Sequence, residues 1–192
     1  MKKILIGTHN KGKFREISYL LSKKIKKISP IKLKISSPKE TGKSFVANSK
    51  LKAMYFSKFT KLPVISDDSG LCIKALGNRP GIYSARWAKK YGSFSNAMKI
   101  ILKKMKNKKD RAAIFVCSLS FKYPGGKMTT VTGQIKGLIS YKIIGKKGFG
   151  YDPIFIPQQE FMTFGQMSNL KKILMDHRYV AFKKLKKKIK IL

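Results

Sequence analysis

Two neighbouring carboxylates, Asp67 and Asp68, stand in the stretch SDDSG directly after the apolar run LPVI. The chain has only eight acidic side chains against 44 basic ones, so this pair is unusual in its own sequence. Adjacent strand residues point to opposite faces, so we expect one carboxylate to face a cleft and the other to be held by hydrogen bonds. A divalent cation commonly offsets the cost of burying a carboxylate. The pair is a candidate catalytic and metal site, and a solvent-exposed turn is the alternative.

A second candidate site is the stretch GTHNKGK, which ends at Lys13. It follows an expected strand and opens an expected helix, so its backbone N–H groups and the helix dipole favour an anion such as phosphate. The stretch fits most of the P-loop pattern, but Phe14 stands where a P-loop needs Ser or Thr to hold magnesium. A P-loop phosphohydrolase and a simple glycine-containing turn are therefore both open interpretations.

Composition favours a folded globular protein rather than a disordered basic tail. The length of 192 residues and the apolar fraction of 43% predict a single domain over residues 1–192, or two lobes that share one sheet, with a full core. The two cysteines, Cys72 and Cys117, lack the spacing of a metal site. No apolar run reaches membrane-spanning length, and MKKILIGTHN is too short for a signal-peptide core. We therefore expect a cytoplasmic location and no membrane insertion.

The net charge of +36 would suit a polyanion partner such as nucleic acid. The excess, however, is almost all lysine and is spread along the chain, whereas base-reading proteins favour arginine. Single-strand binders interleave aromatic and basic residues on one surface. We therefore expect no specific nucleic-acid partner. The basic C-terminal stretch KKLKKKIKIL could touch an anionic surface, but a solvated helix face is the preferred interpretation.

Hydrophobic periodicity predicts an α/β fold with a mixed, twisted sheet flanked by helices. The expected strands are 3–7, 31–36, 62–66, 112–123 and 128–137, and the expected helices are 13–21, 45–59, 94–105 and one from about 168 that carries His177 and Arg178. Strand 62–66 should end on the two aspartates. The last two strands should form an antiparallel hairpin around PGGK.

Six motifs occur in order: THNKGK, ETGKSF with Asn48 and Lys52 following, ISDDSGL, LGNRPGIYSARWA, GFGYDPIF and DHR. Together they resemble the inosine/xanthosine triphosphate pyrophosphatases, over nearly the whole chain from Lys3 to about Leu185. The resemblance implies an ITPase-like α/β fold with two lobes and a central active-site cleft, usually as a homodimer. It also implies Mg²⁺-dependent cleavage of non-canonical purine nucleoside triphosphates to monophosphate and pyrophosphate.

The resemblance further implies a set of site residues. Asp68 would be the catalytic base and a metal ligand, with Glu40 as the second metal ligand. Asp67, Lys52 and Arg86 would support the site. The substrate would be bound by Thr8, Asn10, Lys13, Ser69, Phe149, Gly150, Tyr151, Asp152, Lys172, His177 and Arg178. This chain departs from the family pattern at Lys39, Ala47, Gln166 and Asp176, and the first three changes leave less negative charge around the presumed metal site.

The chemistry of these side chains agrees with such a reaction. Phe149 can stack on a purine, and His177 with Arg178 can donate to a 6-keto oxygen, which hypoxanthine and xanthine possess and adenine lacks. Each residue alone has a structural alternative: Phe149 as a core side chain, and His177 with Arg178 as a surface pair. Two other functions stay open, a P-loop-like phosphohydrolase and a catalytically weakened, basic nucleic-acid-binding relative.

Overall fold

The computed structural model describes residues 2–190, which fall into two compact units. The first unit comprises Met1–Asp68, Cys117–Gly133 and Arg178–Leu192, and the second comprises Ser69–Val116 and Gln134–His177. The chain therefore passes between the units four times, after Asp68, Val116, Gly133 and His177. None of the helices in the described residues is long and apolar enough to cross a lipid bilayer.

The strands form a mixed sheet in the order β2-β1-β3-β5-β6-β7, with β4 paired to β3. Strand β1 is parallel to β2 and β3, whereas β4 and β7 run antiparallel to β3 and β6. The strands are β1 (Lys3–Ile6), β2 (Lys26–Ile28), β3 (Val64–Ile73), β4 (Arg79–Pro80), β5 (Ala112–Lys122), β6 (Met128–Ile139) and β7 (Phe155–Pro157). The helices are α1 (Lys11–Leu20), α2 (Phe45–Phe59), α3 (Ser84–Lys90), α4 (Phe94–Met105), α5 (Asn169–Ile173) and α6 (His177–Lys186). The predicted α/β class with a mixed sheet flanked by helices is confirmed.

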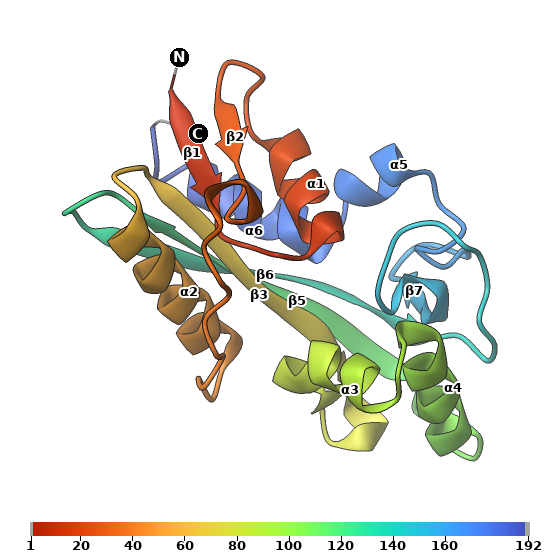
Figure 1. Cartoon of the computed structure of the whole chain (residues 1–192). Coiled ribbons are helices and arrows are strands. Elements are labelled where there is room, and N and C mark those ends of the chain that lie inside the picture. Colours follow the sequence, from red (N-terminus) through yellow and green to blue (C-terminus); the bar gives the residue numbers. More distant parts are fainter. Residues whose placement is uncertain (1, 191–192) are drawn as a thin grey trace. The chain divides into compact units, whose positions relative to one another are not determined.

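In the first unit, helices cover both faces of the strands (Figure 1). Ile4 and Ile6 of β1 pack into one cluster with residues of α1 and α6, whereas the intervening Leu5 packs with Phe56 of α2. This split follows from the alternation of side chains along a strand. Leu185 and Ile189 are buried in the first of these clusters, so the basic C-terminal stretch packs its apolar side on its own unit. Its last two residues lie outside the described part of the chain.

The second unit has its own core, in which α4 packs on β3 and β5. Four buried residues of α4 recur at helical spacing: Ala97, Met98, Ile101 and Met105. They meet Leu71, Ile73 and Phe115 from the strands. Ser93 caps α4 by accepting a hydrogen bond from the N–H of Asn96, which satisfies one of the free donors at the start of the helix.

Three sequence expectations were wrong in detail. Residues 31–36 do not form a strand: Ile31–Leu33 is a short 3-10 helix that follows Pro30, and the strand lies earlier, at β2. Proline fixes its own φ in the range that such a turn needs, which outweighs the polar–apolar alternation of IKLKIS. Strand β3 does not end on the aspartates but continues to Ile73. The last helix is two helices, α5 and α6.

Candidate functional site: a carboxylate and lysine cluster

The loop between β1 and α1 is short and held by its own side chains. Asn10 caps α1, because its Oδ1 accepts a hydrogen bond from the N–H of Lys13 at 3.0 Å. Thr8 Oγ1 accepts from the N–H of Asn10 at 3.2 Å. Gly12 and Lys13 already lie within the helix, so only Gly7–Asn10 form the loop. The Asn10 cap takes up a backbone N–H that a P-loop would direct at phosphate, which disfavours the P-loop interpretation.

Asp67 is fully buried and is surrounded by basic groups. Its Oδ2 lies 3.1 Å from Lys13 Nζ and 3.4 Å from Arg178 Nη2. Burial by itself favours the neutral acid, but Lys13, Arg178 and Lys52 outweigh it, so the pKa of Asp67 lies well below the ordinary value. Arg178 also donates through Nη1 to Glu16, a buried residue of α1. The ionised Asp67 thus fixes two cations of the first unit.

Asp68 has different neighbours, as expected for adjacent strand residues. Asn48 Nδ2 donates to its Oδ2 at 3.1 Å, and Lys52 Nζ lies 3.8 Å from its Oδ1. The same Lys52 Nζ lies 2.5 Å from Glu40 Oε1. Burial, assisted by Glu40, raises the pKa of the Asp68 carboxyl although Lys52 and Lys13 oppose this. A carboxyl with a raised pKa is suited to accept a proton from water.

Lys52 joins the two carboxylates of this cluster. Burial lowers its pKa, but Asp67, Asp68 and Glu40 outweigh that effect and the pKa is raised. The ammonium group therefore lies close to the carboxylates of both Glu40 and Asp68. The described residues contain no group of three or more His, Cys, Asp or Glu side chains that could hold a metal.

In the second unit, the GFGYD loop is held by a buried ion pair. Asp152 Oδ2 accepts from the N–H of Phe149 at 2.7 Å and from Lys172 Nζ at 2.6 Å. The same Nζ lies 4.4 Å from the centre of the Phe149 ring. Gly148 has a positive φ of 74°, and a Cβ there would collide with the Asp152 carboxylate. Three predicted substrate residues, Phe149, Asp152 and Lys172, thus form one cluster.

The other predicted residues of the second unit have varied environments. Tyr151 is buried in the core, and its hydroxyl donates to the carbonyl oxygen of Ser84 at 2.9 Å. The ring of His177 is buried and stacks on Phe115 at 4.8 Å. Ser69 is half-buried on β3, and Arg86 is exposed on α3 with its guanidinium over the Tyr83 ring. Gly150, with a positive φ of 67°, gives the loop a conformation that favours glycine.

The charged groups of the first unit form one cluster, called the first cluster below: Lys13, Glu16, Glu40, Lys52, Asp67, Asp68 and Arg178. The charged cluster around Asp152 and Lys172 is called the second cluster. Sequence reasoning missed Glu16 as a member of the first cluster. Its partner Arg178 is 162 positions later in the chain, so no local pattern links the two. Glu16 lies beside Ile17 on the buried side of α1, and a buried acid in a chain with so few acids was the available signal. The motif contains Asn48 but predicts no role for it. Its side chain connects the N–H of Gly42 to the Asp68 carboxylate.

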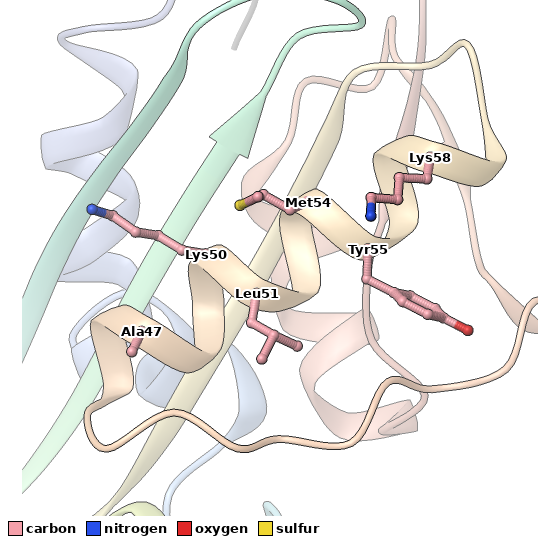
Figure 2. Close-up of a pocket in the computed structure, with 6 residues that line it drawn as sticks. All are labelled: Ala47, Lys50, Leu51, Met54, Tyr55 and Lys58. Atoms are coloured by element: carbon pink, nitrogen blue, oxygen red, sulfur yellow. The ribbon is translucent and has the colours of Figure 1, made fainter.

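Two cavities in the first unit have different relations to these residues. One, of about 380 Å³, borders the β1–α1 loop and is lined in part by Thr8, Asn10 and Phe14. Another, of about 440 Å³, lies on α2 and is lined by Leu51, Met54, Tyr55 and lysines (Figure 2). No predicted site residue lines the second cavity, so we do not assign it to the candidate site.

Comparison with known proteins gives the family. The model of the Ham1 family matches residues 4–188. The chain belongs to the Ham1 family. It is 40% identical over 186 residues to the dITP/XTP pyrophosphatase of Caulobacter vibrioides, covering 96% of both chains. It is 40% identical over 177 residues to that of Gluconobacter oxydans, covering 92% of this chain and 85% of the relative.

Solved structures of this family have the same fold. The Staphylococcus aureus Ham1 protein superposes with a TM-score of 0.87 at 34% identity and 98% coverage of both chains. A HAM1 protein from Coxiella burnetii gives a TM-score of 0.88 at 31% identity and full coverage of both. The family resemblance expected from the six ordered motifs is confirmed.

Proposed function

We propose that this Ham1-family protein hydrolyses non-canonical purine nucleoside triphosphates, such as dITP, ITP and XTP, to the monophosphate and pyrophosphate. The observation that carries the proposal is the Asp68 carboxylate, which is oriented by Asn48 and shares Lys52 with Glu40. Relatives about 40% identical over nearly the whole chain carry the name dITP/XTP pyrophosphatase, which supports the substrate class.

The first cluster is suited to the triphosphate end of the substrate. Thr8, Asn10 and Lys13 bind the phosphates, since the N-terminal end of α1 carries a partial positive charge and Lys13, which Asp67 holds in place, adds an ammonium group. Asp68 accepts the proton of the attacking water, and the anhydride bond between the α- and β-phosphates breaks, so that pyrophosphate leaves. Asp67 and Lys52 support this arrangement by fixing Lys13 and Glu40.

The oxygen donors of this cluster fit Mg²⁺. Glu40 and Asp68 both lie near the Lys52 ammonium group, so the two carboxylates can approach a common cation. Mg²⁺ sites in nucleotide enzymes commonly use one or two carboxylates, with water and substrate phosphates completing the coordination. Two protein carboxylates are therefore sufficient. Bound Mg²⁺ would supply charge neutralisation at the triphosphate.

The second cluster is suited to the nucleoside end. Phe149, on the loop held by Asp152 and Lys172, stacks on the purine, and Gly150, Tyr151 and Ser69 shape the surroundings of the base and sugar. His177 and Arg178 donate to a 6-keto oxygen and so favour hypoxanthine and xanthine over adenine, which requires Arg178 of the first unit to exchange a contact with Glu16 or Asp67 for the base. Arg86 supports this set. We also propose a single domain, a homodimer and a cytoplasmic location.

A triphosphate panel with Mg²⁺ tests the proposal. Incubation with dITP, XTP, GTP and ATP, followed by identification of the phosphorus products, should yield pyrophosphate and monophosphate from dITP and XTP. Orthophosphate and diphosphate as products would instead favour the P-loop-like phosphohydrolase. Salt-dependent binding of DNA or RNA without any triphosphate turnover would favour the catalytically weakened nucleic-acid-binding relative.

A further inference from the structure

The motif LGNRPGIYSARWA forms one wall of a cavity that the proposed reaction does not use. The cavity has a volume of about 610 Å³ and lies within the second unit, between the segment before α3, α3 itself and the end of α4. Helices α3 and α4 are adjacent (Figure 1). A volume of several hundred Å³ is typical of sites for small molecules. None of the predicted catalytic or substrate residues lines it.

The charged residues that line this cavity all have the same sign. They are Arg79, Lys90, Lys104 and Lys108, and none of its nine lining residues is acidic. All four are exposed. The carboxylate of Asp110 does not neutralise these cations, because it lies 3.1 Å from Lys74 and accepts a hydrogen bond from the N–H of Ala112. Four cations around one cavity repel one another, and an anion with several charges would relieve that repulsion.

Two aromatic rings line the same cavity. Trp87 lies on α3 and Tyr91 is the residue that caps the C-terminal end of this helix, with ring centres 6.0 Å apart and planes at 88°. Both rings are partly buried against the core of the second unit, so they are anchored while still lining the cavity. The Lys90 ammonium lies 5.7 Å from the centre of the Tyr91 ring. Such anchored rings offer faces on which a planar base can stack.

The lysine-rich composition of the chain does not account for the presence of an arginine at position 79. The chain has five arginines, and Arg79 is an exposed one whose Nε donates to the carbonyl oxygen of Leu76 at 3.2 Å. This bond orients the guanidinium group and leaves its two terminal nitrogens available. An oriented guanidinium matches the geometry of phosphate better than an ammonium group does.

We propose that this basic and aromatic cavity is a second, non-catalytic site that binds a nucleotide unit. The base stacks on Trp87 or Tyr91, and the phosphate pairs with Arg79 and the lysines Lys104 and Lys108. The nucleotide unit can come from a free nucleotide or from a single strand of nucleic acid, because both present a base and a phosphate in the same way. Sequence-independent binding is expected, since every base has a face that can stack.

The fluorescence of Trp87 tests this proposal directly, because it is the only tryptophan of the chain. Adenosine monophosphate is the probe, since it contains no anhydride bond to hydrolyse. It should quench the fluorescence to saturation, and the double variant Lys104→Gln/Lys108→Gln should weaken binding by about fivefold or more. The control Lys99→Gln/Lys103→Gln removes the same charge from exposed positions of α4 outside the cavity and should change binding by less than about twofold.

A single-stranded oligothymidylate distinguishes the two sources. Equal affinity for the strand and the mononucleotide identifies a free-nucleotide site, and a strand at least about tenfold tighter identifies a nucleic-acid site. The proposal is overturned if neither probe quenches Trp87 saturably, or if both double variants weaken binding equally. It is also overturned if Lys13→Ala, and not the Lys104/Lys108 variant, abolishes quenching. The nucleotide would then be bound at the site of the proposed reaction and not in this cavity.

Discussion

Neutralising each of the two adjacent aspartates should have opposite consequences. Asp67→Asn removes a fully buried charge that lies 3.1 Å from Lys13 and 3.4 Å from Arg178. Removing one partner of a buried ion pair costs about 3–5 kcal/mol. Arg178 keeps Glu16, and the Lys13 side chain is 16% exposed, so we expect a smaller loss of about 2–3 kcal/mol in the free energy of unfolding. For a chain of this size the melting temperature should fall by about 5–10 °C.

Asp68→Asn should instead abolish most turnover and leave the fold intact. Burial makes the ionised form of Asp68 unfavourable, which raises its pKa. The neutral amide loses the 3.8 Å contact to Lys52, but it also removes the desolvation cost of the buried charge, and the two effects offset each other. The new side-chain oxygen can still accept from Asn48. We expect the free energy of unfolding to change by less than about 1 kcal/mol and the rate to fall by about 100-fold or more.

Two measurements decide the matter: thermal unfolding, and release of pyrophosphate from dITP with Mg²⁺. Asp110→Asn is the matched control, since it is the same chemical change at an exposed site of the second unit and should alter neither readout. The pH dependence adds a check. Asp67 has a lowered pKa in the fold, so its stabilisation is present above the unfolded pKa and fades as the pH falls below about 4. An Asp68→Asn protein with a rate near wild type, or an Asp67→Asn protein of unchanged stability, would refute this account.

Three other perturbations extend the test. Lys13→Ala should weaken every triphosphate about equally, seen as similar losses of kcat/KM for ITP and ATP; a loss confined to one base would place Lys13 elsewhere. Wild type should prefer ITP over ATP by at least about tenfold to a hundredfold, because adenine presents a donor to the donors of His177 and Arg178, and Arg178→Ala should reduce that ratio by slowing ITP. An unchanged ratio in this variant would show that base recognition lies elsewhere. Asp152→Asn removes the carboxylate 2.6 Å from the buried Lys172, so it should lower the free energy of unfolding by about 3 kcal/mol, and a stable variant in chemical denaturation would contradict this.

The sequence predicted most elements because their signals are local. Ser44 caps α2 and Ser93 caps α4, each by accepting from the N–H three residues later, and both helices then follow their apolar spacing. The hairpin of β5 and β6 follows from two apolar strands around PGGK. The sequence failed where tertiary pairing decides. Strand β3 continues through its aspartates because its polar side chains find partners such as Asn48 and Lys13, which lie 20 and more positions away.

The candidate site was predicted in part for the same reason. Position in a motif identified Asp68, Lys13 and Lys52 as site residues, but it could not show that Lys52 forms ion pairs with both Glu40 and Asp68. Nor could it show that Arg178 is 1% exposed and bound to Asp67 and Glu16. The sequence suggested a pair of donors aimed at a base. The Arg178→Ala experiment therefore shows whether Arg178 acts on the substrate base or on the carboxylates of Asp67 and Glu16.

Acid scarcity offers a general rule for this chain. Most of the few acidic residues form ion pairs with lysine or arginine. Five of the paired acids belong to the two clusters of the candidate site: Glu16, Glu40, Asp67, Asp68 and Asp152. In a chain of net charge +36, a lysine on the surface has many equivalents, but a carboxylate that fixes a buried cation has none. A lysine-rich composition thus leaves the acids as the informative residues. Applied to the sequence alone, this rule would have drawn attention to all eight acids, and so to Glu16, the residue that motif reasoning missed.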